Sequence, residues 1–120
     1  MKQFTLGQLI DALKPFPDHG DVMFDFGYFY PDSLHSWRGD YSELSIDFKD
    51  DHNYPTVGAF KKRLQEALQQ TFYGWKGGEY VMTRDTPLWV ARRGTVGHTV
   101  ITGVIRERED VIILTGYQNS

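Results

Sequence analysis

The chain has 120 residues, of which 40% are hydrophobic and 24% are charged. These values are typical of one folded domain and not of a disordered segment. The formal net charge of −3 argues against binding to duplex nucleic acid through its phosphates, because such domains are usually basic. The absence of cysteine excludes disulfides, thiolate zinc sites and thiol catalysis. No stretch approaches the roughly 20 apolar residues of a membrane-spanning helix, so we expect one cytoplasmic domain over residues 1–120 with no membrane contact.

The first predicted element is a helix over residues 6–14. Thr5 and Gln8 stand three apart, in the Thr-x-x-Gln form of a capping box. Apolar residues follow at helical spacing, namely Leu6, Leu9, Ile10 and Leu13. Pro15 and Pro17 then end the helix, because proline removes a backbone donor and clashes with the preceding turn.

Alternating apolar residues predict two strands next. The alternation runs over residues 22–29 and, more cleanly, over 44–48. The stretch 31–39 lies between them, begins with proline and is predicted to be a loop. The loop between these strands therefore carries Trp37 and Arg38, with Tyr41 at the start of the second strand.

A second helix is predicted from the N-cap Thr56 to about Gln70. Its first residues, Thr56-Val57-Gly58, resemble Thr5-Leu6-Gly7 at the start of the first helix. Each helix is also followed by a tryptophan-cation-glycine block, at residues 37–39 and 75–77. These parallels suggest an ancient internal duplication.

The second half contains four further predicted strands. They cover residues 80–82, 88–91, 98–106 and 111–117, with a turn at 107–110 inside the last hairpin. The full order is α-β-β-α-β-β-β-β. Because short turns join most neighbouring strands, we expect an α+β fold with an antiparallel sheet and two helices packed on one face.

Two short blocks are the candidates for a binding surface. Residues 36–41 read Ser-Trp-Arg-Gly-Asp-Tyr, and residues 74–80 read Gly-Trp-Lys-Gly-Gly-Glu-Tyr. Tryptophan stacks on planar groups, the cations attract anions, and glycine backbone exposes N–H groups. The predicted ligand-binding residues are Trp37, Arg38, Tyr41, Trp75, Lys76, Gly77, Gly78, Tyr80, Arg84 and Trp89. Each tryptophan has the alternative of folding back over the core edge, and each cation that of a surface ion pair.

No pattern in the chain indicates a catalytic or metal centre. The four histidines are scattered and match no zinc-ligand spacing. No serine stands in a nucleophile-elbow context. We expect no catalytic residues, no metal and no cofactor.

Three segments of the chain together resemble a family of small uncharacterised proteins encoded by tailed bacteriophages and prophages. The matching segments are Ser36-Trp37-Arg38-Gly39-x-Tyr41-x-x-Leu44, Gly74-x-Lys76-Gly77-Gly78-x-Tyr80-x-Met82 and Thr86-Pro87-x-Trp89-x-Ala91. The resemblance spans most of the chain, and the two glycine blocks are its most specific part. It implies an accessory phage protein in the cytoplasm of an infected bacterium, and it supplies no activity.

Context and surface together favour a non-enzymatic protein that binds and sequesters a small anionic, nucleotide-like ligand, as a homo-oligomer. A nucleotide needs an aromatic face for its base and cations for its phosphates. The alternative is a module that inhibits a host defence enzyme or assists phage assembly, because tyrosine, tryptophan and arginine also dominate protein interfaces. A small phosphohydrolase is the third hypothesis and lacks a visible base or metal site. The sequence leaves open whether the two tryptophan blocks share one pocket.

Overall fold

A computed structural model of the chain describes residues 2–27, 29–36, 43–68, 70–73, 79–91 and 99–117, without the side chains of Ser36, Tyr73 and Tyr80. The fold is mixed α+β, with more sheet than helix. The elements in chain order are α1 (Leu6–Leu13), β1 (Val22–Phe24), β2 (Tyr30–Ser36), β3 (Leu44–Lys49), α2 (Val57–Ala67), β4 (Thr71–Tyr73), β5 (Glu79–Val81), β6 (Leu88–Val90), β7 (Thr99–Glu107) and β8 (Asp110–Tyr117).

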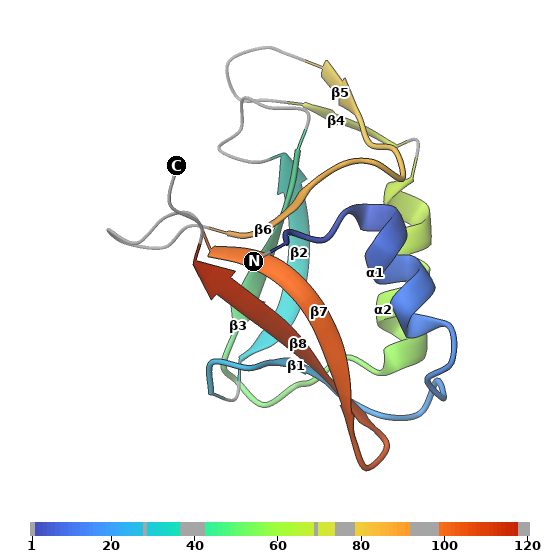
Figure 1. The fold of residues 1–120 in the computed structure, drawn as a ribbon, viewed down its shortest axis with the longest axis vertical. Helices are drawn as coiled ribbons and strands as arrows, with labels where there is room; N and C mark the ends of the chain where they lie inside the picture. The colour runs from blue at the N-terminus through green and yellow to red at the C-terminus, as the bar shows by residue number, and fades with distance from the viewer. Residues whose placement is uncertain are drawn as a thin grey trace.

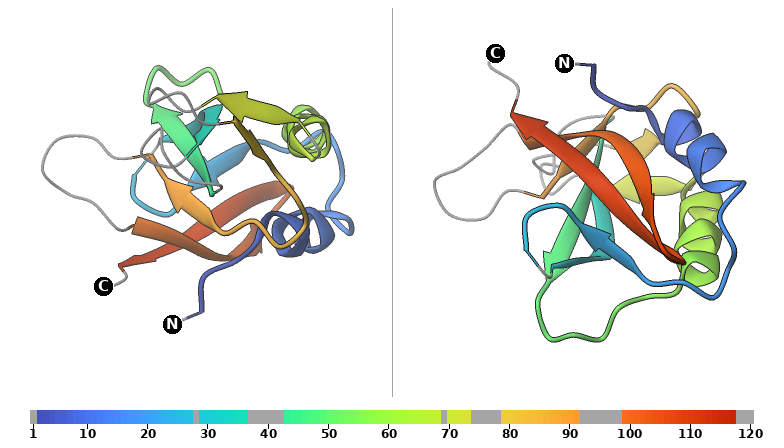
Figure 2. Two further views of the ribbon diagram at one scale, coloured as in Figure 1. Left: turned by 90° about the horizontal axis from the view of Figure 1, so that it is seen from above. Right: turned by 60° about the horizontal axis from the view of Figure 1, so that its bottom comes forward.

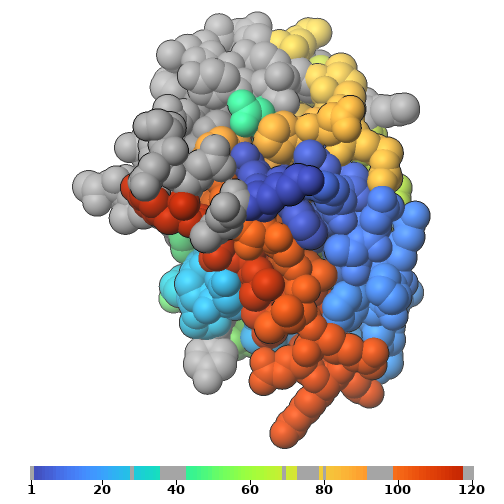
Figure 3. Space-filling view, in the orientation of Figure 1, coloured from blue at the N-terminus to red at the C-terminus, as the bar shows by residue number. Residues whose placement is uncertain are grey.

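Six strands form a sheet that curls into a near-barrel. Their order is β1-β8-β7-β6-β3-β2, and β4 and β5 form a separate two-stranded sheet. The two edges approach each other where the backbone N–H of Phe24 donates to the carbonyl of Phe29 (2.8 Å), just before β2. The helices α1 and α2 lie side by side on one side of this barrel (Figures 1 and 2). The segment before α1 runs between β6 and β7 (Figure 3). There the backbone N–H of Phe4 donates to the Ile101 carbonyl (2.7 Å), and the Phe4 carbonyl accepts from the Leu88 N–H (3.0 Å).

Both helix starts are confirmed. The Thr5 side chain accepts a hydrogen bond from the Gln8 backbone (3.2 Å), and the Gln8 side chain accepts one from the Thr5 backbone (2.9 Å). The Thr56 hydroxyl accepts from the backbone N–H of Ala59 (3.1 Å). Each cap satisfies donors that a helix otherwise leaves unpaired at its first turn.

The expectation of an antiparallel sheet is wrong in part, because two of the strand pairs are parallel. The strand β1 pairs with β8, and β3 pairs with β6, in parallel registers. The pairs β2–β3, β6–β7 and β7–β8 are antiparallel, as expected for neighbours in sequence. Each parallel pair joins strands that are far apart in the chain, so turn signals between neighbours could not reveal it.

The first strand is shorter than expected, and the expected loop 31–39 begins as a strand. The strand β1 ends at Phe24, and the chain bends over residues 25–27, where Gly27 has a φ of 91°. The strand β2 then runs through Pro31 to Ser36, with an irregular register between Pro31 and Leu34. Because β2 is an edge strand of the sheet order, it tolerates a proline, which cannot donate to the ladder.

The last hairpin is confirmed, with its first strand shifted by one residue, its second strand one residue longer than expected, and a two-residue turn. Arg108 adopts a φ of 59° between β7 and β8. The strand β4, in contrast, was not expected from the sequence. Its three residues pair with β5. The side chain of its middle residue, Phe72, is buried.

The helix starts also meet the rest of the chain in one repeated way. In each helix, the first two backbone N–H groups donate to carbonyl groups from the opposite half of the chain. The four bonds join Leu6 to Thr86 (2.8 Å), Gly7 to Arg84 (2.9 Å), Val57 to Gly20 (2.8 Å) and Gly58 to Asp18 (3.0 Å). The repeated Thr-apolar-Gly pattern therefore combines a cap, a buried residue and a glycine that lets a second backbone pass close by.

The sheet repeats in the same manner. Leu44 pairs with Leu88 as Val111 pairs with Val22, and both hairpins have a register irregularity at the matching position. The unit α1-β1-β2-β3 therefore corresponds to α2-β6-β7-β8, and the two units exchange contacts reciprocally, as in an approximate two-fold arrangement. The helices and strands therefore form a structural repeat, while the duplication itself stays a prediction. The repeat does not extend to the tryptophan blocks, because residues 37–42 join β2 to β3, whereas residues 74–78 join β4 to β5, which have no counterpart in the first unit.

The core fills the space between the barrel strands and the helices. Twelve of its members form corresponding pairs from the two units. The pairs are Leu6 and Val57, Leu9 and Phe60, Leu13 and Leu64, Val22 and Leu88, Leu44 and Val111, and Ile46 and Ile113, all no more than 2% exposed. Helix and strand periodicity thus place equivalent apolar side chains on both sides of one core.

Candidate functional site

A pocket of about 410 Å³ lies where β1, β3, β6 and β8 end and β7 begins. These strand ends lie on the side of the barrel away from α1 and α2 (Figures 1 and 2). The lining residues are Phe26, Phe48, Val90, Ala91, Thr99, Thr115, Gly116 and Tyr117. The volume falls within the range of small-molecule sites. We call this cavity the barrel-end pocket.

One wall of the barrel-end pocket is aromatic. Phe26 stacks on Phe24, with ring centroids 4.8 Å apart and planes inclined by 17°. Phe48 meets Phe26 and Phe29 edge-on at 5.3 and 5.1 Å. Offset and edge-to-face contacts of this kind hold aromatic rings in defined orientations. The wall is therefore preformed and offers aromatic surface to an occupant.

Another part of the lining carries hydroxyl groups. Thr99 and Thr115 form it together with Gly116. Asp25 follows the last residue of β1, and its carboxylate accepts hydrogen bonds from the Thr115 backbone (2.8 Å) and hydroxyl (2.5 Å). The carboxylate thereby continues the β1–β8 ladder beyond the strand end and fixes the Thr115 hydroxyl. No arginine or lysine belongs to the described lining of this pocket.

Most of the binding residues predicted from the sequence lie outside the described residues. These are Trp37, Arg38, Tyr41, Trp75, Lys76, Gly77 and Gly78. The backbone of Tyr80 belongs to β5, and its side chain is not described. Their role in binding stays a prediction.

Arg84 lies at the first turn of α1. Its guanidinium pairs with Asp11 (2.5 Å) and donates to the Gly7 carbonyl (3.3 Å). Hydrogen bonding from Lys14, together with the charge of Arg84, lowers the pKa of Asp11 below its usual value. Arg84 thus ties the turn before β6 to α1, and it is absent from the lining of the barrel-end pocket.

Trp89 faces away from the core side chains Leu88 and Val90, in a small cluster with Val100. Its indole N–H donates to Glu43 (2.8 Å), and the residue is only 8% exposed. In this arrangement little of the ring is open to a ligand. The structure therefore brings neither Arg84 nor Trp89 to the barrel-end pocket.

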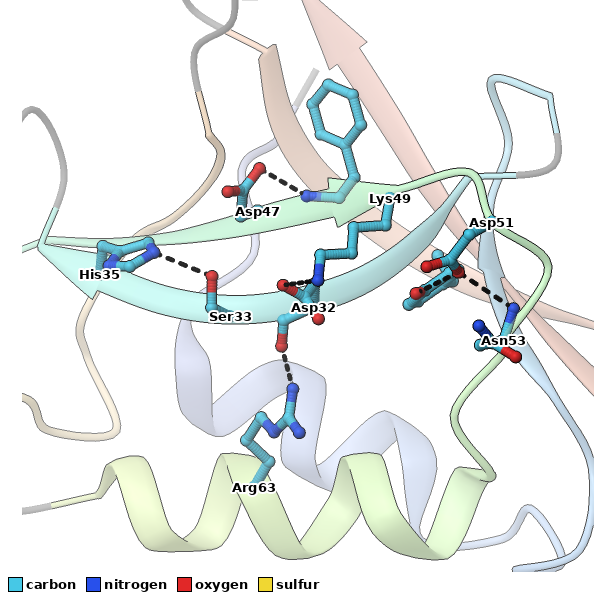
Figure 4. A network of polar contacts seen from close by, with 10 residues as sticks. Asp32, Ser33, His35, Asp47, Lys49, Asp51, Asn53 and Arg63 are labelled. Carbon is cyan, nitrogen blue, oxygen red and sulfur yellow. Dashed lines mark hydrogen bonds and ion pairs between the residues drawn. The ribbon is translucent and has the colours of Figure 1, made fainter.

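Apart from the barrel-end pocket, a cluster of polar side chains lies along β2, β3 and the segment that follows β3 (Figure 4). The Tyr30 hydroxyl donates to the Asp51 carboxylate (2.5 Å), which also accepts from the Asn53 backbone (3.2 Å). The hydrogen bond to Asp51, together with burial and nearby carboxylates, raises the pKa of Tyr30 to about 12. The same bond lowers the pKa of Asp51. This pairing anchors the turn after β3 and keeps the Tyr30 hydroxyl protonated near neutral pH.

The remaining contacts of this cluster are ion pairs and strand contacts. Lys49 pairs with Asp32 (3.6 Å), and Arg63 of α2 donates to the Asp32 carbonyl (Figure 4). Ser33 and His35 stand 2.9 Å apart on β2, at a distance suited to a nucleophile and its base. Among the described residues no carboxylate contacts His35, so these residues supply no orienting third group of a triad. Within the same residues, no group of three or more acidic or histidine side chains is placed to hold a metal ion.

Sequence patterns alone did not reveal the barrel-end pocket. The alternation over residues 22–29 placed Phe24 and Phe26 on one face. Joining them to Phe48, Thr99 and Thr115 needs the parallel pairs β1–β8 and β3–β6. Those pairs connect opposite halves of the chain, and no short-range signal in the sequence marks them.

Comparison with protein-family models, with curated proteins and with solved structures found no match. In the described part of the chain, neither helix is both long and apolar enough to cross a membrane.

Proposed function

We propose that the protein binds a small nucleotide-like ligand without turning it over, with the planar part of the ligand in the barrel-end pocket. The pocket itself carries this proposal. It is concave, has a preformed aromatic wall and offers hydroxyl groups, and these are the features of a site for a small planar molecule. The resemblance to phage-encoded proteins supports sequestration as the purpose of binding.

The anionic part of such a ligand needs positive charge at the rim. Arg92 and Arg93 directly follow the lining residue Ala91 in the sequence. Both lie outside the described residues, and their side chains are the proposed source of this charge. Arginine binds phosphate in a bidentate manner. The predicted residues of the two tryptophan blocks would be further contacts.

Native mass spectrometry of the protein purified from phage-infected cells tests this proposal. A stoichiometric small mass that is released on denaturation would support it and identify the ligand. Thermal unfolding with added AMP or a cyclic dinucleotide gives the affinity, because a hundredfold excess over Kd raises stability by about 2.7 kcal/mol. If the protein carries no small mass and no nucleotide raises its melting temperature, the proposal is wrong.

Three variants locate the binding site. Phe26→Ala removes part of the aromatic wall and should weaken binding. Ile105→Ala is the matched control, because Ile105 is 49% exposed on β7 and does not line the pocket. A Trp37→Ala, Trp75→Ala double variant tests the tryptophan blocks. Loss of binding in the double variant alone would place the ligand outside the barrel-end pocket.

A protein partner is the second candidate function, because Tyr117 at the pocket rim is 56% exposed. Exposed tyrosine is enriched among the hot spots of protein interfaces. The same mass spectrum distinguishes the two: a retained second protein favours an inhibitor or assembly factor. A symmetric oligomer with a bound small molecule favours a ligand-binding homo-oligomer.

A further inference from the structure

The barrel-end pocket exists because the two units carry different side chains at corresponding positions. The registers relate Phe48 to Thr115, since Phe48 pairs with Pro31 as Thr115 pairs with Ile101. They also relate Lys49 to Gly116, since Lys49 pairs with Tyr30 as Gly116 pairs with Val100.

Two more correspondences follow from the same registers. Phe24 corresponds to Val90, because Phe24 pairs with Ile113 as Val90 pairs with Ile46. Phe29 corresponds to Thr99, because Phe29 directly precedes Tyr30 and Thr99 directly precedes Val100, the counterpart of Tyr30.

All four smaller residues of these pairs line the pocket, namely Val90, Thr99, Thr115 and Gly116. In the first unit the larger residues include Phe24, Phe29 and Phe48, whose ring centroids lie 4.8 to 5.5 Å from that of Phe26. The Phe48 ring also contacts those of Phe24 (6.4 Å) and Phe29 (5.1 Å). The second unit lacks the corresponding rings. The pocket is therefore the space that a symmetric aromatic cluster would fill.

From this asymmetry we infer that the pocket binds an uncharged aromatic ring that carries an N–H donor. Such a ring takes the place of the missing phenyl groups and meets Phe26 and Phe48 with the same stacked or edge-on geometry. The Thr115 hydroxyl gives its proton to Asp25 (2.5 Å), so toward an occupant it only accepts. The Asp25 charge disfavours an anionic group at that position. This inference rests on the proposed function and names the chemistry of the buried part of its ligand.

The probes that test it are indole, cyclohexanol and benzoate, added to the whole chain and followed by backbone amide NMR. Indole combines an aromatic ring with an N–H donor, cyclohexanol has a saturated ring, and benzoate is an aromatic anion. We expect indole to shift the amide signals of Thr99, Thr115 and Gly116. Its Kd should be about threefold to tenfold lower than that of either other probe, the ratio that aromatic contacts contribute.

The decisive variants place in the second unit the phenylalanine that the first unit has at the corresponding position. Thr115→Phe, and independently Thr99→Phe, should fill the pocket and weaken indole binding about tenfold or more, with a melting temperature at or above that of the wild type. Ile105→Phe adds the same side chain at an exposed position outside the pocket and should leave binding unchanged.

The outcomes separate this inference from the proposed function. Equal binding of cyclohexanol or benzoate, or the failure of both filled variants to fold, overturns the inference and leaves nucleotide binding intact. If AMP binds but shifts only signals outside the pocket, both the inference and the assigned location are wrong. If no probe and no nucleotide binds, the proposed function also fails.

Discussion

The glycines at the helix starts provide a matched pair of substitutions. Gly7 and Gly58 occupy the same position after their threonine caps, so replacement by alanine changes helix propensity equally, by at most about 1 kcal/mol. Their surroundings differ. A Cβ at Gly7 would lie 2.8 Å from the Arg84 Cβ and 2.9 Å from the Arg84 carbonyl oxygen, whereas a Cβ at Gly58 would lie 3.0 Å from the Asp18 Cβ as its nearest neighbour.

The closer approach should decide the effect on stability. At both sites the glycine N–H holds the neighbouring backbone by a hydrogen bond, of 2.9 Å at Gly7 and 3.0 Å at Gly58. The difference is that the added Cβ would lie 2.9 Å from the bonded carbonyl oxygen at Gly7 but 3.4 Å from it at Gly58. Overpacking of this kind costs about 1–3 kcal/mol, so Gly7→Ala should be less stable than Gly58→Ala by about 1–2 kcal/mol. In a domain of this size that is roughly 4–8 °C in melting temperature. Circular dichroism during thermal and urea unfolding measures it. Equal losses in the two variants would refute the argument from close approach.

Two further predictions concern the caps and the buried tyrosine. Thr5→Ala and Thr56→Ala should each lose about 1 kcal/mol of stability in urea unfolding, with a larger loss at Thr5, where the capping box is reciprocal; unchanged midpoints would contradict the assigned caps. The pKa of Tyr30, about 12, is raised above the ordinary value of about 10, so its contribution to stability is present below pH 10 and is lost as the pH rises toward 12. Absorbance titration of the wild type against Tyr30→Phe should show this late ionisation, and Asp51→Asn should return it toward 10; an unchanged pKa in Asp51→Asn would exclude the carboxylate as its cause.

Local patterns predicted the helices well, for local reasons. The capping box of Thr5 and the cap of Thr56 act within one turn, and the apolar spacing that follows faces the core. The hairpin β7–β8 was also predictable, because two alternating runs flank a short turn. In contrast, the strand β2 was missed, since Pro31 and the polar residues after it resemble a loop until β3 pairs with them.

The barrel-end pocket shows what local patterns could not provide. Phe48 and Thr115 lie at corresponding ends of β3 and β8, yet Phe26 and Thr99 share a pocket with them only because strands of the two units pair with each other. The sequence also drew attention to Trp89 and Arg84, and each makes a contact with a distant carboxylate, Glu43 or Asp11. Whether an aromatic or cationic residue faces a ligand or a neighbouring chain segment depends on long-range packing.

The sequence by itself determined the α+β class, the start of each helix and the repeated Thr-apolar-Gly pattern, because capping and apolar periodicity depend on residues a few positions apart. Only the tertiary structure decided that the sheet is mixed, that the two units interlock and that a pocket opens between aromatic and small side chains at matched positions. Those features arise from the pairing of strands that are distant in the chain, where burial of a shared core selects the partner.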